Sequence, residues 1–318
     1  MAELRKDYLL DRFVIIATER HKRPHQFKAD KPSRGDLDFF APGNEHLTPP
    51  EIYRVQDSKG RWKVRVFPNK YAFVSPMFEG AKVDPRTDNT FFTYADAIGA
   101  HEVVVETPLR SKQLWDLSDE EAFVVFDTFA QRVAALRQDP AVKYVSVFKN
   151  SGRDAGTSIH HSHSQIVAYN LVPRSILALE EACRLFPYDP YTRIIDVERT
   201  SPRHIRSSAQ TISFAPYASR FELEAWVFPF RDVRCLTDLN AEELMDMTRH
   251  IMALLRSLQA ITVPYNMVLV SGTDKVRFHV QILPRSAIWA GFEMGTETFV
   301  NAVTPEDAAS FYRGENVK

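Results

Sequence analysis

Apolar and polar residues follow two regular patterns along this chain, and each pattern predicts one kind of element. Alternation, or a short apolar run between turn residues, predicts strands at 12–17, 62–67, 102–106, 144–148, 163–167, 221–228, 265–270 and 279–283. Apolar residues at helical spacing predict two long helices, which open with the capping boxes of Ser118 with Glu121 and of Asn240 with Glu243. Shorter helices are predicted within 171–186 and after Thr304.

The order of these elements repeats. A strand, a capped helix, another strand and a short histidine strand occur once before residue 170 and again after it. Tyr144 matches Tyr265, and His163 matches His279, at the nearly constant separation that duplicated modules produce. We therefore expect an α+β fold of two related modules, 1–170 and 171–318, whose antiparallel sheets lie side by side and are each crossed by one long helix.

The second module is predicted to be a degenerate copy that supports the first, because it lacks the glycine-rich turn and the paired histidine. Between the modules, the residues 188–191 are predicted to break the shorter helix. The chain from there to Phe214 is expected to be a connector with edge strands, and no chemistry is assigned to it.

Composition and charge narrow the function classes. With 318 residues, 44% of them hydrophobic, the chain can bury the core of one large domain or two fused ones. A net charge of -1 argues against a nucleic acid or a membrane surface held by bulk electrostatics. Two cysteines without a Cys-x-x-Cys fit a reducing compartment. Since we find neither an apolar signal core nor a membrane-length apolar run, we expect a cytoplasmic protein.

The candidate chemistry lies in a polar turn and the strand after it. The turn, 150–158, has two glycines, and its backbone N–H groups and hydroxyls are suited to face an anion. In the following strand, His161, His163 and Gln165 project from one face if the side chains alternate. A phosphate cradle followed by a histidine face indicates phosphorus chemistry.

A neutral imidazole has a lone pair that can attack phosphorus, and a covalent phosphohistidine divides one difficult transfer into two easier ones. Two alternatives stand beside this interpretation. Single histidines in strands are mostly structural, and histidines two apart on a strand can share a metal ion. The turn and the paired imidazoles favour catalysis over a structural role, and the metal site stays open as the other alternative.

At these residues the chain resembles the histidine triad (HIT) superfamily, and within it the galactose-1-phosphate uridylyltransferase branch, which includes members similar to ADP-glucose phosphorylase. Hydrolases of the superfamily have a third histidine where this chain has Gln165, and the transferase branch has glutamine. The resemblance implies that His163 attacks the α-phosphorus of a nucleoside diphosphate sugar and releases hexose 1-phosphate. It also implies that His161 positions the neighbouring ring and that Gln165 protects the nucleotidylated enzyme from water.

Further site residues follow from the resemblance alone. Phosphate contacts are expected from four residues of the turn, Asn150, Gly156, Thr157 and Ser158. Nucleotide contacts are expected from Arg20 and Arg23 of an arginine loop, and from Asn69 and Tyr71 in the loop after the strand at 62–67. Sugar contacts are expected from Phe292 and Glu293, which in relatives often come from the partner subunit of a homodimer. Without the resemblance, Tyr71 reads equally well as a core aromatic and Glu293 as a surface carboxylate.

The chain departs from the family at its metal positions. Where relatives have a Cys-x-x-Cys and a histidine for structural zinc, this sequence has Asp38, Ala41 and Arg110, which leaves His161 as the matching ligand. Where they have a His-x-His pair for a second metal, iron, it has Arg277 before His279. We expect no zinc, no iron and no other cofactor, and a structural role for His279.

Three functions remain open at this point. The first is a transferase that moves a nucleoside monophosphate from a nucleotide sugar to a hexose 1-phosphate. The second is a phosphorylase that uses inorganic phosphate as acceptor, and the third is a non-catalytic nucleotide sensor. The expected partners are a nucleotide sugar, a sugar phosphate or inorganic phosphate, and a second copy of the chain.

Overall fold

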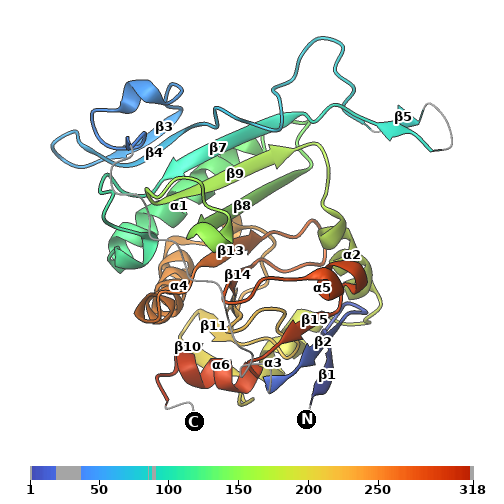
Figure 1. Ribbon diagram of the computed structural model, residues 1–318. Coiled ribbons are helices and arrows are strands. Elements are labelled where there is room, and N and C mark those ends of the chain that lie inside the picture. Colours follow the sequence, from blue (N-terminus) through green and yellow to red (C-terminus); the bar gives the residue numbers. More distant parts are fainter. Residues whose placement is uncertain (1, 19–36, 85, 88–90, 316–318) are drawn as a thin grey trace.

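A ten-stranded sheet runs through the whole protein (Figure 1). The structure is a computed structural model that describes residues 2–18, 37–84, 86–87 and 91–315. The first half contributes β3 (Tyr53–Gln56), β4 (Trp62–Pro68), β7 (Gly99–Val105), β8 (Tyr144–Ser151) and β9 (His163–Tyr169). The second half contributes β10 (His204–Ser207), β11 (Thr211–Phe214), β12 (Ala225–Pro229), β13 (Tyr265–Val270) and β14 (His279–Pro284).

The strand order has an internal symmetry. It reads β10-β11-β12-β14-β13-β8-β9-β7-β4-β3, so that the two halves repeat one order outward from the pairing of β13 with β8. These two strands run antiparallel, with Asn266 opposite Asn150. The predicted α+β fold with duplicated modules is confirmed, and the two predicted sheets are continuous because β13 and β8 form hydrogen bonds along this central seam.

The two long helices begin where their capping boxes predict. In α1 (Asp119–Leu136), the Ser118 hydroxyl accepts a hydrogen bond from the Glu121 backbone. In α4 (Ala241–Ala260), the Asn240 side chain accepts one from the Glu243 backbone. Each reciprocal cap satisfies backbone donors that the first helical turn leaves without partners.

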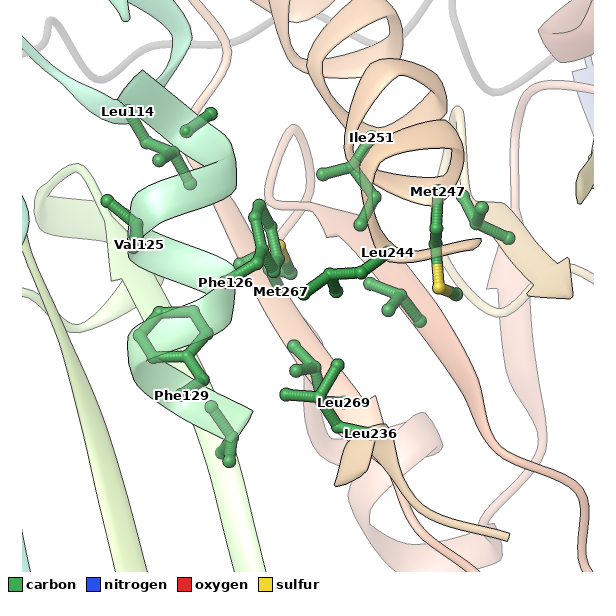
Figure 2. Close-up of a cluster of buried hydrophobic side chains, with 14 of the residues drawn as sticks. Leu114, Val125, Phe126, Phe129, Leu236, Leu244, Met247, Ile251, Met267 and Leu269 are labelled. Carbon is green, nitrogen blue, oxygen red and sulfur yellow. The ribbon is translucent and has the colours of Figure 1, made fainter. Parts of the chain in front are cut away.

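Both helices cover the same face of the sheet and enclose the main hydrophobic core. Figure 2 shows Phe126 of α1 and Leu244 of α4 pointing toward one another over Met267 and Leu269 of β13. Burying each large apolar side chain contributes about 1.5–3 kcal/mol. Because alternate residues of a strand face opposite sides, the burial of Ile166 in this core turns His163 and Gln165 to the other face.

Smaller elements bring the two ends of the chain together. A separate three-stranded sheet pairs β1 (Glu3–Lys6) and β2 (Phe13–Ile16) with β15 (Phe299–Asn301). The other elements are β5 (Arg86–Thr87), β6 (Thr93–Tyr94), α2 (Arg174–Arg184), α5 (Gly291–Thr296) and α6 (Pro305–Tyr312). In the part of the chain that the structure describes, no helix has the length and apolar character needed to cross a bilayer.

The sequence prediction for the connector is correct in part. The predicted helix ends at Arg184, before 188–191, and β10 lies at the edge of the sheet, but the same segment also starts a helix that was not predicted, α3 (Pro190–Glu198). The Asp189 carboxylate caps it by accepting from the backbone N–H groups of Tyr191 and Thr192. Proline at the first helical position needs no hydrogen-bond partner and favours helical geometry, so this proline also marks a helix start.

Candidate active site

The turn between β8 and β9 is shaped by two glycines. Gly152 has φ 90° and Gly156 has φ 86°, and a short 3₁₀ turn, Arg153–Ala155, lies between them. A Cβ on Gly152 would come within 2.8 Å of the Pro264 side chain, whereas one on Gly156 would meet open space. Both positions favour glycine through their backbone angle, and Gly152 also through the close approach of the second half.

Some polar groups of the turn form hydrogen bonds within the turn, and others are exposed. The backbone N–H groups of Ala155, Gly156 and Thr157 bond to carbonyl groups of the turn itself. Ser158, by contrast, is exposed. An anion at this turn would therefore meet the Ser158 hydroxyl rather than those three amides.

Asn150 connects the turn to the second half of the protein. The Asn266 side-chain amide donates to Asn150 Oδ1 and to the Ala155 backbone oxygen, both at 2.8 Å. Sequence reasoning missed Asn266, although a polar residue inside the otherwise apolar strand 265–270 was a usable signal. The predicted phosphate-binding turn is thus held in place by a strand of the second module.

His163 has one ring nitrogen in use and one available. Its Nδ1 lies 2.8 Å from the His161 backbone oxygen, and since a carbonyl only accepts, Nδ1 carries the proton. Nε2 then keeps its lone pair, and among the described residues nothing bonds to it. The residue is 8% exposed, with the Phe40 ring edge-on at 5.4 Å between ring centres. Burial lowers the pKa of His163 below 6.5, which keeps the ring neutral.

Gln165 and Asn69, both predicted site residues, meet at a histidine that sequence reasoning missed. His101 Nε2 lies 2.8 Å from Gln165 Oε1 and 3.1 Å from Asn69 Nδ2. Asn69 is itself oriented, because its Oδ1 accepts from the Tyr71 backbone N–H at 2.9 Å. The available signal was a histidine directly before the predicted strand 102–106.

The remaining candidates lie apart from this group or outside the described residues. Tyr71 is 81% exposed, so the core alternative for this ring is wrong. Phe292 is also exposed, and the Glu293 carboxylate accepts from the Ala290 backbone within α5, a helix that contacts β15. Arg20 and Arg23 fall outside the described ranges. The structure thus groups Asn69, His163 and Gln165 and leaves the sugar contacts untested.

His161 has no ring nitrogen left for a metal. Its Nδ1 lies 2.8 Å from Asp38 Oδ2, and its Nε2 lies 2.7 Å from the Thr107 backbone oxygen. The other two positions of the family's zinc site have Ala41 and Arg110, neither of which is a zinc donor. The residues present do not fit a structural zinc, and Asp38 and His161 hydrogen-bond to each other instead.

The second metal position does not fit a metal either. Arg277 is buried, and its guanidinium donates to Asp232 at 3.0 Å and to the Phe230 backbone oxygen at 3.1 Å. His279 Nε2 lies 3.0 Å from the Gln281 amide nitrogen, which occupies its lone pair. Across the described ranges, no three His, Cys, Asp or Glu side chains are grouped so as to hold a metal ion.

A buried ion pair lies under the histidine strand, on the face opposite the His163 ring. Lys149 Nζ donates to Glu106 Oε2 at 2.7 Å, and to Ser162 Oγ and the His163 backbone oxygen, both at 3.1 Å. The Ser162 and Ser164 hydroxyls donate to the same carboxylate. The backbone that positions His163 is therefore supported from below by groups that sequence reasoning missed.

Comparisons with known proteins show the family to which this chain belongs. Residues 1–173 match the family described as galactose-1-phosphate uridyl transferase, N-terminal domain. An ADP-glucose phosphorylase of Arabidopsis thaliana is 29% identical over 325 residues, which cover 98% of this chain and 92% of the relative. A galactose-1-phosphate uridylyltransferase of Thermotoga maritima is 26% identical over 342 residues, which cover 100% of both chains.

The fold comparison extends over the whole chain. The crystal structure of an ADP-glucose phosphorylase from Arabidopsis thaliana with bound ADP-glucose superposes with a TM-score of 0.85 and 26% sequence identity, covering 100% of both chains. The family match spans more than half of this sequence. The chain therefore belongs to the galactose-1-phosphate uridyl transferase family and is a nucleotidyltransferase.

Proposed function

We propose that His163 transfers a nucleoside monophosphate from a nucleoside diphosphate sugar to a phosphate-bearing acceptor. In the first step the Nε2 lone pair attacks the α-phosphorus, a P–N bond forms, and the P–O bond breaks so that hexose 1-phosphate leaves with the electron pair. In the second step an acceptor phosphate oxygen attacks the same phosphorus, and the P–N bond breaks. The supporting observation is the free, neutral Nε2 beside Gln165, with Nδ1 fixed by the His161 carbonyl.

Two acceptors fit this chemistry. A hexose 1-phosphate would make the protein a uridylyltransferase like the Thermotoga maritima relative, and inorganic phosphate would make it a phosphorylase like the Arabidopsis thaliana relative. The phosphorylase is favoured by the higher sequence identity of its relative, 29% against 26% for the uridylyltransferase. The following experiment decides which acceptor and which nucleobase the protein uses.

The test is a pair of half-reactions. The protein is incubated with UDP-glucose or ADP-glucose alone, and intact mass is measured for the gain of one uridylyl or adenylyl group. Galactose 1-phosphate or inorganic phosphate is then added separately, and the nucleotide product is identified. A nucleotide-sized mass gain followed by acceptor-dependent loss is expected. Binding without any covalent gain would instead mean that the protein is a sensor.

The rate of adduct formation is expected to persist to lower pH than the usual imidazole pKa allows. Burial lowers the pKa of His163 below 6.5, so the ring stays neutral in weak acid and loses its lone pair only as the pH falls through this lower value. Measuring the single-turnover rate across roughly pH 5 to 8 should give an acid limb with a midpoint below 6.5. A midpoint above that value would contradict the assignment.

Gln165→His is expected to convert transfer partly into hydrolysis. An imidazole at this position can accept a proton from water, whereas the amide it replaces cannot. Release of the nucleoside monophosphate without an acceptor should rise roughly 10-fold or more. Gln165→Asn is the matched control, since it shortens the side chain without adding a base. Equal hydrolysis by the two variants would show that Gln165 does not control water attack.

We also propose that the reaction needs no zinc or iron, on the chemistry of the donors at both family positions. Dialysis against EDTA is expected to leave activity and the melting temperature unchanged, because the hydrogen bond of Asp38 with His161 and the ion pair of Arg277 with Asp232 need no cation. Metal analysis by plasma mass spectrometry should find well below one equivalent per chain. Stoichiometric zinc, or a loss of activity on dialysis, would overturn this part of the proposal.

A homodimer is the assembly we propose, with Phe292 and Glu293 of one subunit at the sugar of the other. The supporting observation is that Ile288, Phe292 and Met294 expose their apolar side chains along the same segment.

We propose the cytoplasm as the compartment, because Cys183 and Cys235 are both buried and unpaired.

A further inference from the structure

The two copies of the His-x-Gln sequence place equivalent side chains in different hydrogen bonds. His163 with Gln165 begins β9, and His279 with Gln281 begins β14, at matching positions of the repeated strand order. In both copies the histidine Nδ1 donates to the carbonyl two residues earlier, at 2.8 Å and 2.9 Å. The copies differ in the direction taken by the glutamine amide.

In the second copy the glutamine covers the histidine. Gln281 Nε2 lies 3.0 Å from His279 Nε2 and donates to its lone pair, and Gln281 Oε1 accepts from Arg220 at 3.2 Å. An amide two residues along the strand therefore reaches the imidazole without backbone distortion. The same contact in the first copy would occupy the lone pair of His163.

In the first copy a histidine on the neighbouring strand holds the glutamine instead. His101 Nε2 lies 2.8 Å from Gln165 Oε1. Val103 pairs with Gln165, and Trp226 pairs with Gln281, so the residue of β12 that corresponds to His101 is Glu224. A carboxylate cannot donate to a glutamine oxygen, and Glu224 instead accepts from the Trp226 indole at 2.8 Å.

The proton of His101 belongs on Nε2. Burial lowers the pKa of His101, so the ring is neutral and carries one proton. On Nδ1 the proton would be buried without an acceptor; Nε2 would then accept from the Asn69 amide at 3.1 Å, but it would face the closer atom, Gln165 Oε1 at 2.8 Å, with two lone pairs opposed. On Nε2 it is donated to that oxygen, which the Asn69 amide also reaches at 3.5 Å.

We propose that His101 is a positioning residue for nucleotidyl transfer. By donating to Gln165 Oε1 it keeps the glutamine off His163 Nε2, and it leaves the Gln165 amide nitrogen as a donor for a nonbridging phosphate oxygen. This inference rests on the proposed function for its kinetic effect. Its geometric claim, that His101 keeps the lone pair of His163 uncovered, concerns the resting protein alone.

The kinetic test uses two replacements of similar length. His101→Met removes the donor, whereas His101→Gln supplies an N–H at about the same reach. Adduct formation at saturating nucleotide sugar should slow on the order of 10- to 100-fold in His101→Met and recover in His101→Gln, with KM changed less than the rate. Melting temperatures are measured for both, so that a folding defect is recognised. Equal rates in the two variants would overturn the proposal.

A double-variant cycle separates positioning from a general effect on the site. If His101 acts through Gln165, then His101→Met should slow a Gln165→Ala protein no further. Independent, multiplicative losses would show that His101 acts by another route.

A spectroscopic test decides the geometry even if no adduct forms. In protein labelled with ¹⁵N-histidine, the Nε2 signal of His163 is assigned by its loss in His163→Gln. It should shift in His101→Met toward the signal of His279 Nε2, because it then accepts the Gln165 amide. Absence of an adduct in the wild-type protein would refute the proposed function, whereas an unmoved His163 signal would refute the role of His101.

Discussion

His163→Ala is expected to abolish covalent nucleotidylation and to reduce turnover by on the order of 10⁴-fold or more. The substitution removes the ring nitrogen to which no described residue bonds, and the neighbouring imidazole cannot replace it. His161 is the nearest in sequence, and both of its ring nitrogens are bonded. The measurement is intact mass after incubation with the nucleotide sugar, together with steady-state turnover.

The matched control is His279→Ala, which removes the equivalent imidazole of the second module. Its Nε2 is covered by Gln281, so adduct formation should persist in this variant. Peptide mapping of the wild-type adduct should place the added mass on the peptide that contains His163. An adduct of unchanged mass and rate in His163→Ala would identify a different nucleophile.

Lys149→Met is expected to lower the free energy of unfolding by about 3–5 kcal/mol. Lys149 and Glu106 are both buried, and removal of the ammonium group leaves a buried carboxylate with only two serine hydroxyls as partners. The measurement is equilibrium unfolding in urea, followed by tryptophan fluorescence and circular dichroism together, because agreement of two probes supports a two-state analysis.

Two further variants make this result specific. Lys143→Met removes an exposed lysine just before the same strand and should change stability by no more than about 0.5 kcal/mol. The double replacement Lys149→Met with Glu106→Gln should be more stable than Lys149→Met alone, since no uncompensated charge remains. A loss below about 1 kcal/mol in Lys149→Met would mean that Glu106 is not left as an uncompensated buried charge.

The sequence predicts those parts of this protein that depend on local pattern. The capping boxes of Ser118 and Asn240 locate both long helices, because a helix start is determined by a few neighbouring residues. The matched strands and histidines reveal the duplication, and two glycines mark the turn. The histidine strand indicates the family. Each of these signals lies within a short window of the chain.

The missed features depend on contacts between distant segments. His101 reaches Gln165 only because β7 pairs with β9 in one particular register, which the strand patterns do not define. Lys149 of β8 and Glu106, which follows β7, meet beneath β9 because both of their strands pair with β9 in a fixed register. The start of α3 at Asp189 and Pro190 was missed because the same residues also separate it from the preceding helix.

The seam between β8 and β13 has a consequence for how this protein can be divided. Separated from residues 171–318, the first half would present the whole eight-residue edge of β8 to solvent, together with the side of α1 that now contacts α4. Such a fragment would tend to recruit another copy of itself along that edge. In the intact protein β13 of the same chain covers this edge, so its protection does not depend on protein concentration.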